Sequence, residues 1–430
     1  MSVTGPASGG SPGRPPLLSL DEALQRLLAA VSPLPVSDGA TVSTFEALGR
    51  VLSEPLRSLV DVPPADNTSM DGYALRAADV AEPGTVIPVS LRIPAGTAPQ
   101  PLPPGSAARI FTGAQIPPGA DAVVMQEQCE PVDSGASVRV LAPPRSGQWI
   151  RRRGEDVQAG STVLAAGEVL DAQRLGLAAS VGCGSVPVMR RPRVALFSTG
   201  DELVMPGSLP PDALPPGTLF NSNRYTLAAL IRACGAECTD FGIVPDRLDA
   251  TRAALRGAAD GHDLILTSGG VSVGEEDHLR PAVQAEGRLD LWQIAMKPGK
   301  PLAFGAVRRS AADARGGEAY FIGLPGNPVS SFITFLLAVR PVLRRLMGAS
   351  TAMPAPIPMR ADFDWPRADV RREFLRVRRN AEGGLDLFPN QSSGVLTSAV
   401  WGDGLVDVPA GQAFARGRVV AYRPFSEFLA

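Results

Sequence analysis

The hydrophobic pattern is most regular between residues 191 and 348, where short runs of consecutive apolar residues alternate with stretches of helical spacing. Unbroken apolar strands separated by helices predict a parallel sheet that is covered on both faces. The predicted strands are 194–197, 239–244, 263–267, 289–296, 302–304 and 320–322, and the predicted helices are 223–234, 248–259, 277–286 and 328–347. We therefore expect a central, doubly wound α/β domain over 191–348.

The segments on either side of this region have a different pattern, in which short β-prone runs are interrupted by proline and glycine. Residues 60–142 predict an inserted β domain, and residues 355–430 predict a C-terminal β domain that resembles a barrel. Residues 17–59 and 143–190 combine helical and β patterns and predict an N-terminal mixed domain. The chain is thus expected to be a multidomain α/β and β protein.

Composition narrows the class of protein. The chain is 44% hydrophobic with a net charge of −2, so no overall field favours nucleic acid or membrane. Residues 1–16, rich in Gly, Ser and Pro, predict a disordered tail, not a signal peptide, and no apolar run reaches the roughly 18 residues of a membrane span. Two histidines and four cysteines without a CxxC pair exclude a His-rich zinc site and make a disulfide framework implausible. We expect a cytoplasmic protein without nucleic-acid or membrane partners.

Lysine is almost absent. Of the 41 basic residues only Lys297 and Lys300 are lysine, and both lie in one short segment, 296–301. An ammonium group is a compact, mobile charge, whereas guanidinium is a wide planar fork, and the intervening Pro-Gly indicates a tight turn. Two lysines on one turn predict an anion site. The alternative is that codon usage spared two surface lysines, each of which would contribute only about 0–1 kcal/mol to stability.

Polar and glycine-rich segments follow the carboxyl ends of the predicted strands, where ligands bind in open α/β sheets. The glycine-rich loop that begins at Ser268 exposes backbone N–H groups of the kind that bind phosphate. Glu202, Asp246 and Asp277 place carboxylates at the same edge, which suits a Mg²⁺ ion held between protein and substrate phosphates. Helix capping is an alternative role for Asp246 and Asp277, but it does not explain Glu202.

Eight motifs occur in order from about residue 20 to the C-terminus. They are DNTSMDGY (66–73), FTGA (111–114), AVVMQE (122–127), IRRRGED (150–156), STGDE (198–202), SGGVSVG (268–274), KPGKP (297–301) and LPGNP (324–328). Together they resemble the molybdopterin molybdenumtransferase family, which includes MoeA and the E domain of gephyrin. The resemblance implies that molybdate is inserted into adenylylated molybdopterin with release of AMP. It also implies a homodimer in which the 66–73 loop reaches the α/β domain of the partner subunit.

The resemblance and the strand-end pattern together indicate the site residues. The expected catalytic residues are Asp71, Thr112, Arg151, Asp156, Glu202, Asp246, Asp277, Lys297 and Lys300, and the expected metal ligands are Asp277, Glu202 and Asp246. The expected substrate-binding residues are Ser268, Gly269, Gly270, Ser272, Pro298, Pro325, Asn327, Pro328, Arg376 and Ser393. Arg376 and Ser393 resemble the family's oxyanion-contacting pair. Many relatives carry a lysine where this chain has Gln293, so any role of that charge is not kept.

Two other readings of the motifs remain open. The α/β segment also resembles molybdopterin adenylyltransferases and a pyridine-nucleotide-recycling family, but the flanking β domains and the lysine loop argue against both. A scaffold role, as in gephyrin, is weakened because no long linker joins a second catalytic module. A molybdopterin adenylyltransferase is instead a candidate partner that would supply the substrate.

Overall fold

The computed structural model describes residues 17–270, 278–350 and 353–429. The chain forms two compact units. The first comprises the described residues up to Ala40, Gly49–Ser53 and those from Met189 onward, and the second comprises Thr41–Leu48 and Glu54–Val188. None of the helices over the described residues is long and apolar enough to cross a membrane.

A six-stranded sheet forms the centre of the first unit, in the order β16-β13-β17-β21-β20-β18. The strands are β13 (Arg193–Thr199), β16 (Glu237–Val244), β17 (Leu264–Ser268), β18 (Gly287–Gln293), β20 (Pro301–Arg308) and β21 (Glu318–Leu324). Strands β16, β13, β17 and β21 are parallel. Strands β13, β17 and β21 have the buried apolar runs expected of a covered parallel sheet, whereas β16, at the edge, is mostly exposed or half-buried. Strand β20 is antiparallel to both neighbours, because the short connection from β18 leaves no room for a crossover helix.

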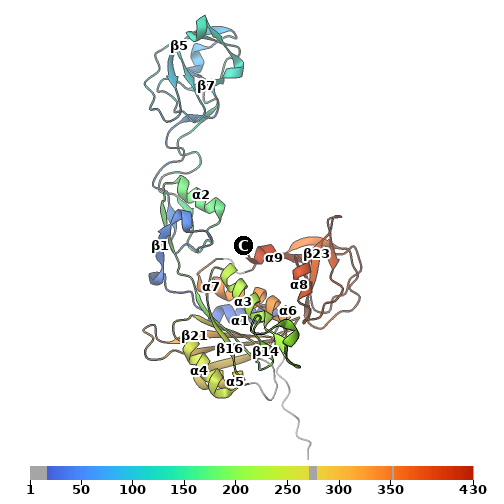
Figure 1. The fold of residues 1–430 in the computed structure, drawn as a ribbon. Helices are drawn as coiled ribbons and strands as arrows, with labels where there is room; N and C mark the ends of the chain where they lie inside the picture. The colour runs from blue at the N-terminus through green and yellow to red at the C-terminus, as the bar shows by residue number, and fades with distance from the viewer. Residues whose placement is uncertain (1–16, 271–277, 351–352, 430) are drawn as a thin grey trace, which may run out of the picture. The chain divides into compact units, whose positions relative to one another are not determined.

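Helices cover both faces of this sheet, which confirms the doubly wound arrangement (Figure 1). They are α1 (Leu20–Ala30), α3 (Ser222–Ala233), α4 (Leu248–Ala259), α5 (Leu279–Glu286), α6 (Pro328–Thr334) and α7 (Arg340–Leu346). Helices α4 and α5 pack together on one face, and α3 and α6 contact each other on the opposite face. On the α4 and α5 side the core is formed by fully buried residues such as Phe197, Leu255 and Phe321.

The helix predicted over 328–347 is interrupted by a π-helical turn, Phe335–Val339, between α6 and α7. Pro341 follows directly and occupies the first turn of α7. A proline inside a helix lacks the N–H donor, and its ring collides with the carbonyl one turn earlier. The wider π turn accommodates this residue without ending the helix.

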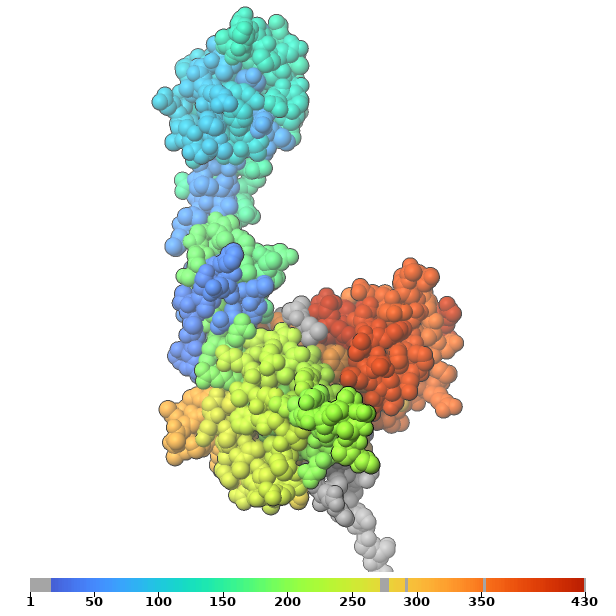
Figure 2. Space-filling model, viewed as in Figure 1, coloured from blue at the N-terminus to red at the C-terminus, as the bar shows by residue number. Residues whose placement is uncertain are grey.

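The C-terminal segment of the first unit is a closed five-stranded barrel. Its strands are β22 (Ile357–Ala361), β23 (Arg372–Arg379), β24 (Gly384–Leu387), β25 (Gly404–Val408) and β26 (Val419–Pro424), and the helices α8 (Thr397–Trp401) and α9 (Phe425–Leu429) follow β24 and β26. Closure results from β23 pairing with both β24 and β25. Strand β19 (Met296–Lys297) pairs with β23, so the barrel contacts the lysine loop; Figure 2 shows this segment in orange and red against the α/β part.

The second unit is mainly β structure. Its six-stranded sheet contains β4 (Gly72–Leu75), β5 (Thr85–Ile93), β6 (Ala107–Ile110), β7 (Ala122–Met125), β8 (Cys129–Val132) and β9 (Ser137–Val140). Other strands and helices in this unit or at its border are β1 (Ala40–Ser43), β2 (Leu56–Arg57), β3 (Asn67–Thr68), β10 (Ile150–Arg151), β11 (Thr162–Leu164), α2 (Ala172–Ser180) and β12 (Ser185–Val188). The short strands β14 (Leu203–Val204) and β15 (Leu219–Phe220) belong to the first unit. The apolar residues Leu75, Ile110 and Val124 are buried in the sheet's core.

Candidate functional site

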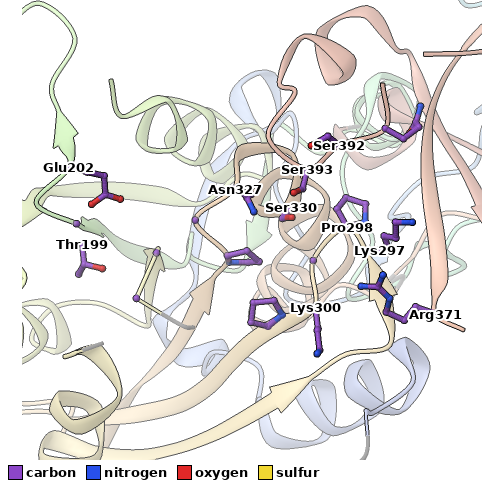
Figure 3. Close-up of a pocket in the computed structure, with 18 of the residues that line it drawn as sticks. Thr199, Glu202, Lys297, Pro298, Lys300, Asn327, Ser330, Arg371, Ser392 and Ser393 are labelled. Atoms are coloured by element: carbon purple, nitrogen blue, oxygen red, sulfur yellow. The ribbon is translucent and has the colours of Figure 1, made fainter. Parts of the chain in front are cut away.

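A cavity of about 690 Å³ lies in the first unit, where the carboxyl ends of the parallel strands meet the lysine loop and the barrel segment. Ten of the expected site residues line it: Glu202, Asp246, Gly269, Gly270, Lys297, Pro298, Lys300, Pro325, Asn327 and Ser393. Figure 3 shows Glu202 at one end and Lys297, Lys300 and Arg371 at the other. The expected residues Ser272 and Asp277 lie outside the described part of the chain.

The carboxylate end of the cavity is formed by Glu202 and Asp246. Glu202 follows β13 and lies so close to Gly200 that a Cβ there would be 2.4 Å from its carboxylate Oε2. A larger residue at this position would displace the Glu202 carboxylate, and the φ of +138° also favours glycine. Asp246 follows β16, but the N-cap of α4 is Arg247, and no side chain caps this helix. Capping therefore does not explain Asp246.

These carboxylates match the requirements of Mg²⁺. Magnesium is usually held by one or two carboxylates together with substrate phosphates and water. Glu202 and Asp246 supply two carboxylates on one cavity wall. No group of three or more acidic, His or Cys side chains in the described ranges is arranged around a metal position. A Mg²⁺ ion would thus need oxygen ligands from the substrate in addition to these residues.

The glycine-rich loop after β17 is tied to the loop that precedes α6. Asn223, at the start of α3, donates hydrogen bonds to Ser268 Oγ (2.8 Å) and to the carbonyl of Gly326 (2.7 Å). Ser268 is itself buried and does not line the cavity, whereas Gly269 and Gly270 do. Pro328 is the first residue of α6 and also lies outside the cavity lining. Asn223, which the sequence did not indicate, thus positions both loops.

Replacing Asn223 with leucine should destabilise the fold and lower activity. The variant keeps a similar volume but leaves Ser268 Oγ and the Gly326 carbonyl without this buried donor. Unsatisfied buried polar groups cost about 1–3 kcal/mol. Urea unfolding should show this loss, while the adjacent Ser222→Ala variant should match the wild type. Equal stability of the leucine variant would show that the loops do not depend on this residue.

Lys297 is not the free surface cation that its loop position suggests. Its Nζ lies 3.0 Å from Glu373 Oε1 and 3.3 Å from Asp369 Oδ2, and Glu373 also accepts a hydrogen bond from Trp365 Nε1 at 2.8 Å. Burial acts to lower the pKa of Lys297, but the hydrogen bonds and charges of Glu373 and Asp369 outweigh it and raise the pKa. Because Glu373 is almost fully buried, we now expect Lys297 to contribute more to stability than the roughly 0–1 kcal/mol of an unpaired surface lysine.

Two other cations line the same end of the cavity. Lys300 Nζ makes no ion pair with any residue that the structure describes. Arg371 lines the cavity and donates from Nε and Nη2 to Asp369. Arg371 belongs to an arginine-rich segment in which no local signal distinguishes it. It reaches the site because β19 pairs with β23, placing Met296 opposite Arg372.

Arg376 does not face the cavity with Ser393, in contrast to the expected oxyanion-contacting pair. Its side chain is buried, with 1% exposed, and donates to Ser398 Oγ (3.1 Å) and to the carbonyls of Phe374 (3.3 Å) and Ser392 (3.2 Å). Burial lowers the pKa of Arg376 to about 10. Arg376 instead holds the loop that brings Ser393 to the cavity wall.

The other expected residues belong to the second unit, where three motifs converge. Asp71 Oδ1 accepts hydrogen bonds from the backbone N–H and Oγ1 of Thr112, both at 2.7 Å, and these lower the pKa of Asp71. Strand β3 pairs with β10 and places Asn67 opposite Arg151. Asp156 is exposed, and its backbone N–H donates to the carbonyl of Val62. The structure thus joins the 66–73, 111–114 and 150–156 motifs into one surface region.

Comparison with known proteins gives consistent matches along the chain. Three family models match: the MoeA N-terminal region (domain I and II) over 18–182, the probable molybdopterin binding domain over 195–345, and the MoeA C-terminal region (domain IV) over 358–425. A molybdopterin molybdenumtransferase of Nostoc sp. is 37% identical over 88% of this chain and 86% of its own length.

A second curated relative and a solved structure agree with these matches. A molybdopterin molybdenumtransferase of Haemophilus influenzae is 38% identical over 77% of this chain and 78% of its own length. A crystal structure of the molybdopterin biosynthesis MoeA protein of Pyrococcus horikoshii superimposes with a TM-score of 0.78 at 28% identity. That superposition covers 95% of this chain and 99% of the Pyrococcus chain.

Proposed function

Because this chain belongs to the molybdopterin molybdenumtransferase family, an enzyme family of molybdenum cofactor biosynthesis, we propose that it inserts molybdate into adenylylated molybdopterin and releases AMP. The observation that carries this proposal is one cavity with a cationic end and a carboxylate end. Such a cavity suits a substrate pair in which one partner is a tetrahedral dianion and the other carries a phosphoanhydride. The proposed location is the cytoplasm, with a molybdopterin adenylyltransferase as the substrate supplier.

At the cationic end, Lys300, Arg371 and Lys297 would bind molybdate, and Ser393 would donate a hydrogen bond to one of its oxygens. Positioned donors that are fixed before the reaction stabilise developing negative charge without reorganisation. Pro298 shapes the same wall, while Arg376 acts indirectly by holding the serine loop. No nucleophilic side chain is required for this step, because the dithiolene sulfurs of the substrate are the groups that bind molybdenum.

At the carboxylate end, Glu202 and Asp246, together with Asp277, would hold Mg²⁺ against the substrate phosphates. The ion would neutralise charge on the phosphoanhydride as AMP leaves. Gly269 and Gly270 would let the pyrophosphate approach the backbone closely, since neither carries a side chain and both have positive φ. Pro325 and Asn327 form the adjoining wall.

We further propose that the protein is a homodimer and that Asp71, Thr112, Arg151 and Asp156 complete the site of the partner subunit. Two apolar side chains in the second unit support an interface: Phe45 is 96% exposed and Leu48 is 63% exposed, within one turn of each other. Exposed aromatic residues of this kind are enriched at protein interfaces.

A mixed-dimer experiment tests whether the site is shared. Asp71→Asn and Lys300→Ala are each expected to be inactive alone. If each site takes Asp71 from one subunit and Lys300 from the other, a heterodimer of the two variants contains one intact site, and its activity should be about half that of the wild-type dimer. Differently tagged variants, co-expressed and purified by both tags, give this measurement. An inactive heterodimer would place both residues in the same subunit's site.

The reaction itself is tested by adding molybdate to the protein and adenylylated molybdopterin in the presence of Mg²⁺. Release of AMP should depend on molybdate. Release at the same rate without molybdate would indicate hydrolysis of the phosphoanhydride by water instead.

A further inference from the structure

Asp369 bonds to two of the three cations at the cationic end of the cavity, Lys297 and Arg371. Its Oδ1 accepts hydrogen bonds from the backbone N–H (3.0 Å) and Nε (3.1 Å) of Arg371, and its Oδ2 accepts from Arg371 Nη2 (3.0 Å) and Lys297 Nζ (3.3 Å). The bonds from Arg371 are the main reason that the pKa of Asp369 lies well below its ordinary value. Asp369 is therefore a carboxylate at neutral pH, joined to both cations.

The charges at this end of the cavity largely cancel. Three cations line the wall, namely Lys297, Lys300 and Arg371. Two carboxylates, Asp369 and the buried Glu373, pair with Lys297 and Arg371, which leaves one net positive charge among these five side chains. Figure 3 shows Lys297 and Arg371 side by side, with Lys300 at the same end of the cavity. The two carboxylates lower the positive charge that this end of the cavity offers to a bound dianion.

We propose that Asp369 sets the oxyanion affinity of this cavity: it fixes Arg371 and Lys297 in position, and its negative charge weakens binding of the dianion. This inference rests on the proposed function, because it concerns the molybdate end of the same site. A carboxylate near a bound dianion opposes it by Coulomb repulsion, which is strong where water is partly excluded. Weak binding of the anion before the reaction favours its transfer. Binding that is equally tight before the reaction and in the transition state does not raise the rate of the chemical step.

A purely structural role for Asp369 predicts the opposite result. If Asp369 only orients Arg371 and Lys297, its removal should loosen both donors and weaken oxyanion binding. If its charge limits affinity, the isosteric amide should bind oxyanions more tightly, because the repulsion is removed and its one carbonyl oxygen still accepts two of the four hydrogen bonds. The sign of the change in affinity separates the two roles.

The test is calorimetric titration of molybdate and tungstate into the wild type and the Asp369→Asn variant. We expect the Kd of the variant to fall about tenfold, with a steeper dependence on salt concentration. Asp290→Asn changes net charge equally at an exposed position of β18 that does not line the cavity, and it should leave the Kd unchanged. An unchanged or higher Kd for Asp369→Asn overturns the inference.

A second variant protects the test against local unfolding. Glu373→Gln removes the other compensating charge and keeps one acceptor oxygen, for Lys297 or for Trp365, so it should also lower the Kd. Urea unfolding of both variants shows whether the fold is kept. If the wild type releases AMP with molybdate but neither variant binds oxyanions more tightly, the inference is refuted and the proposed function stands. If the variants bind oxyanions more tightly but the wild type shows no molybdate-dependent AMP release, only the proposed function is refuted.

Discussion

Replacing Lys300 with alanine should lower the rate of molybdate-dependent AMP release by about 10²–10³-fold, comparable to the loss of one preorganised donor at a developing charge. Lys300 lines the cavity and makes no ion pair with another described side chain, so its charge is available to the substrate. For the same reason the free energy of unfolding should change by less than about 1 kcal/mol. Steady-state rates and urea unfolding of the same preparation measure both effects.

Lys297→Ala is the informative comparison, because both lysines lie in one turn but only Lys297 has protein partners. Its removal leaves buried Glu373 with Trp365 as its remaining side-chain partner, so stability should fall by about 1–3 kcal/mol in addition to the loss of activity. Lys297→Arg/Lys300→Arg keeps both charges but widens both head groups, and should be slow. Wild-type turnover in that double variant would mean that the lysines have no special role.

Glu202→Gln and Asp246→Asn should abolish most activity without destabilising the fold. Neither carboxylate caps a helix or forms an ion pair among the residues described, so the neutral amides should fold normally. Losing a metal carboxylate removes several kcal/mol of charge stabilisation, about 10²–10³-fold or more in rate. The Mg²⁺ concentration for half-maximal activity should rise in both variants.

A matched control is available one residue before Glu202. Asp201 accepts the backbone N–H of Asp246 and does not line the cavity. Asp201→Asn, which keeps an acceptor oxygen, should therefore retain an unchanged Mg²⁺ requirement. If Glu202→Gln also retained the wild-type Mg²⁺ dependence, the carboxylate would not be a metal ligand.

The carboxylate end of the cavity could be predicted from sequence, because a local pattern, the position just after a strand, identifies its residues. Glu202 and Asp246 each come just after an apolar strand, and parallel strands bring such ends to one edge. The lysine loop was recognisable for a similar reason, since it follows β18 and carries the chain's only lysines.

The residues that surround the lysines could not be found in this way. Asp369 and Arg371 reach Lys297 through the pairing of β19 with β23, which joins segments more than 70 residues apart without any local pattern. Arg376 was expected at the cavity, because the motif indicates the residue but not the side of the strand that is buried. The π turn before Pro341 and the antiparallel β20 likewise depend on connections and packing, which periodicity does not report.

The most direct test of the central claim is a single-turnover measurement of AMP and protein-bound molybdenum in the same reaction. Adenylylated molybdopterin, Mg²⁺ and limiting molybdate are mixed with the wild-type protein, and both products are quantified over time. Molybdate insertion predicts that AMP appears in step with molybdenum bound to the dithiolene, one for one, and that neither forms with Lys300→Ala. AMP release that is independent of molybdate, or molybdenum uptake without AMP release, would contradict it.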